Sequence, residues 1–282
     1  IGKNAWGWDE YNHYYGNATY KQNSIISVAR FLLRLYLKKL DPAFKPALDK
    51  AINFILSSQY PLGGWPQRYP PRPDRQFQFG GKSEYTSFYV FNDNLTQDNI
   101  EFLIQCYYTL GEERFLDPIR RGMNFYLITQ QGNPQGGWAQ QYDMQLKPAH
   151  ARQYEPASLV PDDSYRIAEL LMKFYEYTGD RKFLARIPDI IQWLESCRLP
   201  AAETEGGKYT HPVFVEVGTN KALYAHRKGT GVLDGHYWID YSSDNPLLHY
   251  GAKEKLDIEK LEEEYKKISA LSPEEATKNS PL

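Results

Sequence analysis

The sequence has little of several features that would point directly to a class of protein. Only two of its 282 residues are cysteines, Cys106 and Cys197, and both lie in apolar helical contexts that are typical of buried side chains, so they do not fix the redox compartment. Basic and acidic residues nearly balance, 33 against 35, and no apolar run approaches the length of about 18 residues that spans a membrane. Nucleotide-binding glycine motifs and metal-spaced histidine pairs are also missing. We therefore expect neither a nucleic acid nor a membrane as partner.

The chain does contain a repeated sequence motif. Gly-Gly-Trp occurs at residues 63–65 and 136–138, and a Gly-Gly pair without the tryptophan follows at a similar spacing, at 206–207. Each of these three sites follows two segments with apolar residues at helical spacing. These segments are 24–39 with 45–58, 94–110 with 115–130, and 163–178 with 181–197. Three helical hairpins at a regular spacing predict an all-α fold, built as a closed or stacked array.

Long loops rich in glycine and proline follow the hairpins, and loops of this length are typical of functional regions. The third loop contains β-like runs on either side of residues 218–220, which predict a small hairpin. Residues 253–282 are highly charged, so we expect a surface helix from Lys255 to Ile268 and a frayed end. We accordingly divide the chain into a catalytic-like helical domain, 1–252, and a C-terminal helix and tail, 253–282.

Two groups of oxygen-bearing side chains lie where helices are expected to start. The first is Phe-Asn-Asp-Asn at residues 91–94, and its oxygens suit a hard cation such as calcium. Aspartate and asparagine are also common helix caps, so a capping role remains open for this group. The second is the pair Asp162 and Asp163, which helix capping explains well.

Basic and aromatic side chains give a second set of candidates. Arg152, in the second long loop, has no capping explanation and could be a carboxylate clamp or a catalytic group. Lys221 and Arg227 lie near the expected small hairpin, where two basic groups facing a cleft would bind an acidic sugar, although ordinary solvated charge is the alternative. Aromatic content is 15%, and flat amphipathic rings suit sugar faces, although tyrosine can also simply cover long helices.

Several longer motifs occur together in this chain. They are Gln-Tyr-Pro-Leu-Gly-Gly-Trp at 59–65, Phe-Asn-Asp at 91–93, Gly-Gly-Trp-Ala-Gln-Gln-Tyr-Asp at 136–143, Lys-Pro-Ala-x-Ala-Arg-x-Tyr-Glu-Pro-x-Ser at 147–158, and Gly-Thr-Asn-Lys at 218–221. Jointly they resemble the family 10 pectate lyases, over residues from about 14 to 227. The resemblance implies an (α/α)3 toroid and calcium-dependent cleavage of polygalacturonate by β-elimination.

The resemblance also implies roles for individual residues. It matches Arg152 to the presumed base and Arg227 to a substrate-binding arginine. It matches Asp93 to a calcium-associated carboxylate, and we include its neighbour Asn94 in the expected calcium site. Because arginine has a pKa of about 12.5–13.8, Arg152 could instead stabilise charge while Tyr154 acts as base. We also expect substrate contacts from Lys221 and Tyr154, and we expect Trp65 and Trp138 to pack the turns or to face a sugar.

The chain departs from the family pattern at three positions. Tyr15 stands where the family has an acidic residue, and Val213 and Lys221 stand where it has arginines. Lysine cannot make the bidentate carboxylate contact of arginine. These changes reduce the number of side chains that would bind uronate and calcium. A different acidic glycan as substrate, or an enzyme with impaired activity, is therefore an alternative.

Our main prediction is a lyase that acts as a monomer on an acidic polysaccharide. One alternative is an inverting glycoside hydrolase on the same toroid, which needs two carboxylates roughly 6.5–9.5 Å apart, from Asp93 with Glu155 or Asp163. Another is a glycan-binding homologue without catalysis. Because the chain begins with Ile-Gly-Lys, we expect a processed or trimmed form of a secreted or periplasmic protein, in which the N-terminal helix typical of the family is missing.

Overall fold

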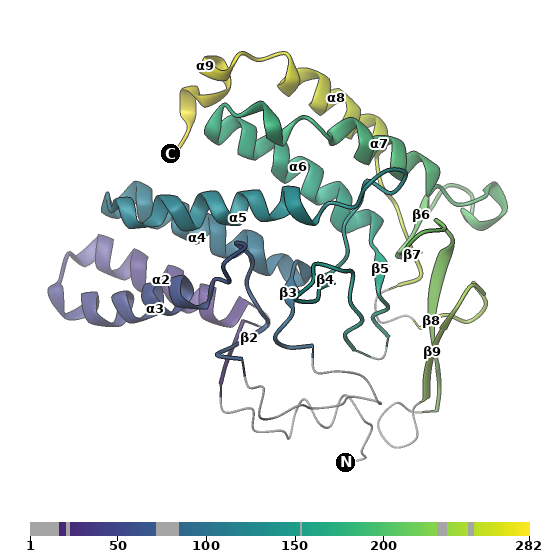
Figure 1. Ribbon diagram of the computed structural model, residues 1–282, viewed down its shortest axis with the longest axis horizontal. Helices are drawn as coiled ribbons and strands as arrows, with labels where there is room; N and C mark the ends of the chain where they lie inside the picture. The colour runs from purple at the N-terminus through teal and green to yellow at the C-terminus, as the bar shows by residue number, and fades with distance from the viewer. Residues whose placement is uncertain (1–16, 21–22, 72–84, 153, 230–235, 248–250) are drawn as a thin grey trace.

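Three helical hairpins lie side by side in the computed structural model, which describes residues 17–20, 23–71, 85–152, 154–229, 236–247 and 251–282 (Figure 1). The hairpins are α2 (Ser24–Lys39) with α3 (Lys45–Ser58), α4 (Leu95–Leu110) with α5 (Leu116–Thr129), and α6 (Pro161–Thr178) with α7 (Ile187–Ser196). All six predicted helices are present, and the predicted fold class, an all-α (α/α)3 toroid, is confirmed. Among the described residues no helix is both long and apolar enough to cross a membrane.

Glycines end the first helix of the second and third hairpins. Gly111 and Gly179 adopt left-handed backbone, each with φ of 68°, and their N–H groups donate to the carbonyls of Tyr107 and Tyr175. Glycine reaches this conformation without a steric penalty, which lets the chain stop a helix and reverse. Leu40 ends α2 in the same conformation, with φ of 50°.

Each of the two Gly-Gly-Trp motifs packs its loop tightly against the following hairpin. A Cβ added to Gly63 would lie 2.1 Å from the carbonyl oxygen of Arg121 on α5, and one added to Gly136 would lie 2.7 Å from that of Asp189 on α7. Only glycine allows so close an approach of two backbones. An added Cβ would meet nothing within 4 Å at residues 206 and 207, so this Gly-Gly pair does not make this contact.

The tryptophans of both motifs belong to the core. Trp65 and Trp138 have no exposed surface, and their indole N–H groups donate to the carbonyls of Ile55 and Tyr126 at 2.9 Å. The expectation that they pack the turns is confirmed. The prediction that they bind substrate is wrong for this structure, because neither ring offers a face to a sugar.

Short strands gather at the end of the hairpins opposite the helix-to-helix turns (Figure 1). They form the pairs β1 (Ala18–Thr19) with β2 (Arg68–Tyr69), β3 (Tyr89–Val90) with β4 (Gln141–Tyr142), and β6 (His211–Pro212) with β10 (Lys253–Glu254), and a sheet in the order β5 (Ser158–Leu159), β7 (Phe214–Glu216), β8 (Ala222–Lys228), β9 (His236–Asp240). The predicted hairpin at residues 218–220 is confirmed as the β7–β8 turn. Strand β9 was not predicted from the sequence; it forms with β8 a ribbon that projects from the helical body (Figure 1).

The C-terminal segment packs on the third hairpin. Helix α8 (Ile258–Ser269) buries Ile258 and Leu261 and contacts α6 and α7, and the short α9 (Pro273–Ala276) also contacts α6. Tyr175 donates to the carbonyl of Leu271 at 2.7 Å, and Ser280 donates to that of Tyr177 at 2.6 Å. The predicted frayed end is therefore wrong, because these contacts hold it against α6. The division of the chain at residue 252 stays a prediction.

Candidate functional site

A pocket of about 460 Å³ lies where the β3–α4 turn, the first turn of α6 and the β6–β10 pair meet. Its lining is dominated by carboxyl and amide side chains, with a single basic residue and two valines. The lining residues are Asn23, Asn92, Asp93, Asn94, Gln140, Val160, Asp162, Asp163, Arg166, Val213 and Glu254. We call it the acidic pocket. It brings together the predicted calcium residues, the aspartate pair of α6 and the departure at Val213.

A strained turn presents the predicted calcium residues to this pocket. Asp93 and Asn94 are exposed and adopt left-handed backbone, with φ of 55° and 57°. The side chain of Asn92 accepts from the N–H of Asp93 at 2.8 Å, and the carbonyl of Gln140 accepts from the N–H of Phe91 at 2.8 Å. Asparagine and aspartate tolerate this conformation better than other non-glycine residues, and such strain is often found at functional sites.

The aspartate pair of α6 faces the same pocket instead of capping its helix. The cap position of α6 is Val160, which makes no side-chain cap bond, so the expected capping role of Asp162 and Asp163 is wrong. Asp162 forms an ion pair with Arg166. Asp163 has one carboxyl oxygen, Oδ2, that is buried and makes no hydrogen bond.

Two carboxyl groups of the pocket have strongly raised proton affinity. Burial, followed by repulsion from Asp162, raises the pKa of Asp163 to about 7, although Arg166 and a hydrogen bond from Gln140 oppose the shift. Burial, followed by repulsion from Asp162 and Asp163, raises the pKa of Glu254 to about 7. Burial together with neighbouring carboxylates thus raises both pKa values, a combination that is common at functional sites.

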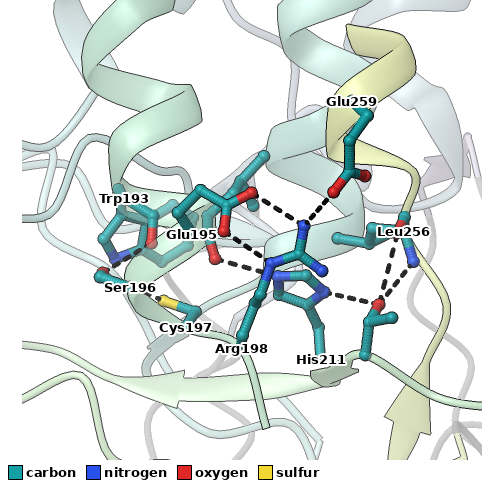
Figure 2. A network of polar contacts seen from close by, with 10 residues as sticks. Trp193, Glu195, Ser196, Cys197, Arg198, His211, Leu256 and Glu259 are labelled. Carbon is teal, nitrogen blue, oxygen red and sulfur yellow. Dashed lines mark hydrogen bonds and ion pairs between the residues drawn. The ribbon is translucent and has the colours of Figure 1, made fainter. Parts of the chain in front are cut away.

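Glu254 was missed by sequence reasoning because only long-range pairing brings it to the pocket. It lies on β10, opposite His211 of β6. A polar network beside this strand pair joins β6 to α7 and α7 to α8: the His211 ring contacts the carbonyl of Leu194 at 2.9 Å, and Arg198, just after α7, bonds to both Glu195 and Glu259 (Figure 2). Burial also lowers the pKa of His211. Nothing in the charged run around residue 254 signals this position.

The donor chemistry of the acidic pocket suits a hard cation. Its carboxylate and amide oxygens are the ligands that calcium takes. The Oδ2 atom of Asp163 accepts no hydrogen bond from the protein, so it is available as a metal ligand. In the part of the chain that the structure describes, however, no three His, Cys, Asp or Glu side chains already converge to hold a metal ion. The residues fit the chemistry of calcium without a finished coordination shell.

Arg152 lies outside the acidic pocket, in a buried ion pair. It is 6% exposed, and its Nη1 lies 2.8 Å from Oε1 of Glu155, which has no exposed surface. Its guanidinium also lies 5.8 Å from the ring centre of Tyr85. A guanidinium that is bonded to a carboxylate favours its protonated form, which works against the predicted role of Arg152 as a base.

The loop of Arg152 contacts the ribbon that carries Arg227. Tyr154 is buried, and its ring centre lies 5.9 Å from that of Tyr237, which is the cross-strand partner of Arg227. Cross-strand partners share one face of a sheet, so Arg227 lies on the side of the ribbon that faces this loop. Arg227 itself is exposed. Lys221 is exposed near the β7–β8 turn, where its Nζ lies 5.2 Å from the ring centre of Tyr241.

A small apolar cluster borders the acidic pocket. It consists of Val160, Val213, Phe214 and Leu223, with Ile239 packed against it. Val160 and Val213 also line the acidic pocket. The structure therefore brings Asp93, Asn94 and Asp163 into one pocket and places the loop of Arg152 beside the ribbon of Arg227. Neither arginine lines the pocket, and Glu155 does not either. Tyr15 lies outside the described residues.

Comparison with known proteins decides the family. The model of the pectic acid lyase family matches residues 3–265, nearly the whole chain. The chain belongs to this family. Among solved structures it is similar to a family 10 polysaccharide lyase from Cellvibrio cellulosa, at 19% identity and a TM-score of 0.51, over 73% of this chain and 69% of that one.

A second solved structure is a mutant of the Cellvibrio cellulosa enzyme in complex with trigalacturonic acid. This family member is similar at 20% identity and a TM-score of 0.52, with the same coverage. At 19–20% identity, this similarity shows a shared fold and nothing about activity. No curated protein matches the chain.

Proposed function

We propose that this pectic acid lyase family member cleaves a uronate-containing glycan by β-elimination, with calcium held in the acidic pocket. The observation that supports the proposal best is the acidic pocket itself, built around the Phe-Asn-Asp turn by which the sequence resembles family 10. The pocket is large enough for part of a sugar ring and carries several oxygen donors that suit calcium. The polysaccharide substrate is expected outside the cell, so secretion or a periplasmic location is part of the proposal.

β-Elimination removes the proton on C5, beside the uronate carboxylate, and expels the oxygen on C4. Bound calcium supplies positive charge that stabilises the negative charge developing next to the carboxylate. In this chain Asp93, Asn94 and Asp163 would hold the ion. These are the residues of the pocket that the strained turn and the start of α6 present most directly.

The other proposed residues lie on the loop of Arg152 and on strand β8. Since Glu155 pairs with its guanidinium, we propose that Arg152 stays protonated and stabilises charge, the alternative left open by the sequence. Tyr154, two residues further along the same loop, then remains the candidate base, and Arg227 the candidate substrate contact. The monomeric state remains a prediction.

The test is the ultraviolet absorbance of the unsaturated product, measured over a panel of pectic substrates with and without a chelator. We expect absorbance that falls when calcium is removed, and that is nearly abolished by Asp93→Asn. A matched control is Asp244→Asn, because Asp244 lies in the exposed turn after β9 and outside the pocket. If no substrate gives absorbance at any pH, the lyase proposal fails.

Hydrolysis is the second candidate, because Asp93 shares the pocket with Asp163, one of the two partners considered for an inverting hydrolase. Glu155, the other partner, is buried in its ion pair with Arg152. New reducing ends without ultraviolet absorbance would favour hydrolysis. Binding of galacturonate oligosaccharides without any product would favour a glycan-binding homologue.

A further inference from the structure

The projecting β8–β9 ribbon has an outer face that the proposed chemistry does not use. Its register pairs His226 with Trp238 and Lys228 with His236. Because cross-strand partners share a face and side chains alternate along a strand, these four side chains lie on one face, away from Arg227 and Tyr237. We call this set, His226, Lys228, His236 and Trp238, the outer ribbon face.

Three rings are stacked along the outer ribbon face. The ring centres of His226 and Trp238 lie 5.2 Å apart with planes inclined by 15°, and those of His236 and Trp238 lie 6.0 Å apart with planes inclined by 23°. His226 is buried, whereas Trp238 is 39% exposed. The indole is therefore supported by His226 and keeps part of its surface exposed.

The orientation of the Trp238 ring is also fixed by hydrogen bonding. Its indole N–H donates to Oδ2 of Asp240 at 3.0 Å, and Oδ1 of Asp240 accepts from the N–H of Ser242 at 2.9 Å. The same Oδ1 lies 2.9 Å from Nε2 of His226. A ring that is held before binding loses little conformational freedom when a ligand stacks on it, which favours affinity.

The charges on this face complement an acidic ligand. Lys228 and His236 are exposed beside the ring stack, and the carboxylate of Asp240 is engaged by Trp238, Ser242 and His226. Flat amphipathic rings suit the apolar faces of pyranose rings, and ammonium groups suit carboxylates. A uronate oligosaccharide offers both features at a regular spacing.

We propose that the outer ribbon face binds an acidic oligosaccharide, with a pyranose ring on Trp238 and a uronate carboxylate at Lys228 and His236. The choice of ligand rests on the proposed function, since the same glycan would extend outward from the site of cleavage. The face is separate from the acidic pocket, none of whose lining residues belongs to the ribbon.

The test is calorimetric binding of a long galacturonate oligosaccharide to the full chain and its variants. Trp238→Ala should weaken binding by about 2- to 12-fold, because aromatic stacking contributes on the order of 0.5–1.5 kcal/mol. Trp238→Phe should recover part of the loss, and Lys228→Ala should reduce the dependence of binding on salt. The matched control is Tyr108→Ala, which removes a 73% exposed aromatic ring from α4. Thermal unfolding of each variant establishes that it is folded.

The outcomes separate this inference from the proposed function. If the oligosaccharide binds through Trp238 but no substrate is cleaved, the inference stands and the lyase proposal fails. If substrates are cleaved but Trp238→Ala and Tyr108→Ala bind the oligosaccharide equally well, the inference is wrong. Equal affinity for a neutral oligosaccharide of the same length would also overturn it, because the face would then not select acidic sugars.

Discussion

Breaking the buried ion pair of Arg152 and Glu155 should lower the free energy of unfolding by a large amount. Glu155 has no exposed surface, and its two carboxylate oxygens accept from the side chain of Arg152 at 2.8 Å and from the backbone N–H of Arg152 at 2.9 Å. The backbone N–H of Glu155 donates to the carbonyl of Arg152 at 2.8 Å. These bonds close the turn that carries Arg152 and Tyr154.

Glu155→Gln keeps the shape of the side chain and removes its charge. Removing one partner of a buried pair costs about 3–5 kcal/mol, because the other charge stays out of water. For a domain of roughly this size, 1 kcal/mol shifts Tm by about 2–4 °C, so we expect Tm to fall by roughly 6–20 °C. Thermal and urea unfolding at neutral pH measure the effect.

The control removes a comparable pair from the surface. Arg121 and Asp117 are 2.9 Å apart on α5, and the side chain of Asp117 is 78% exposed. Asp117→Asn should therefore cost less than about 1 kcal/mol. If Glu155→Gln lowers Tm no more than this control does, the reasoning about the buried pair is refuted. The double variant Arg152→Met with Glu155→Leu should recover much of the loss, since apolar replacement of a whole buried pair is often neutral.

Three further predictions concern packing, pH and calcium. An added Cβ at Gly137 would lie 2.2 Å from the Trp193 ring, so Gly137→Ala should cost about 1–3 kcal/mol in urea unfolding, whereas Gly132→Ala, with nothing within 4 Å, should cost far less. The pKa of Asp163 rises on folding from about 3.8 to about 7, so the contribution of Asp163 to the free energy of unfolding of the metal-free protein should be fully present below pH ~4 and be lost as pH rises through 7; the difference in unfolding free energy between the unchanged protein and Asp163→Asn, measured against pH, isolates this contribution. Calcium should raise Tm, and less so in Asp93→Asn; equal shifts would contradict the assigned site.

The fold was predictable because its signals are local. Apolar residues at helical spacing and the glycines after α4 and α6 define hairpins without any long-range information. The one large boundary error concerns α7, predicted from residue 181 but beginning at Ile187. Pro188 sits in its first turn, where the lack of an N–H is harmless, and residues 181–183 form a separate 3-10 turn.

The parts that sequence reasoning missed depend on distant contacts. The C-terminal end is held by Tyr175 to Leu271, 96 residues apart, and by Tyr177 to Ser280, 103 residues apart. Charge in the tail predicted solvent exposure, but a few side chains facing α6 were enough to fix it. Strand β9 likewise forms only by pairing with β8.

The candidate site also contains both residues that could be predicted from the sequence and residues that could not. Asp93 could be identified because its motif is contiguous, whereas Glu254 reaches the pocket only through β10 and the network around His211. The tryptophans show the opposite error: a short motif drew attention to Trp65 and Trp138, but an aromatic ring beside two glycines packs a tight turn as readily as it binds a sugar.

Under the proposed function, the charges of the acidic pocket predict that a cation is needed for uronate binding itself. A uronate carboxylate that enters meets Asp93, Asp163 and Glu254, while the guanidinium of Arg166 is engaged by another carboxylate. Like charges about 4 Å apart near a protein surface repel by about 4 kcal/mol. Val213 supplies only apolar surface where the family resemblance leads one to expect an arginine. A divalent ion is then the group that can join pocket and substrate, so a chelator should weaken the binding of a uronate sugar in the pocket as well as its turnover.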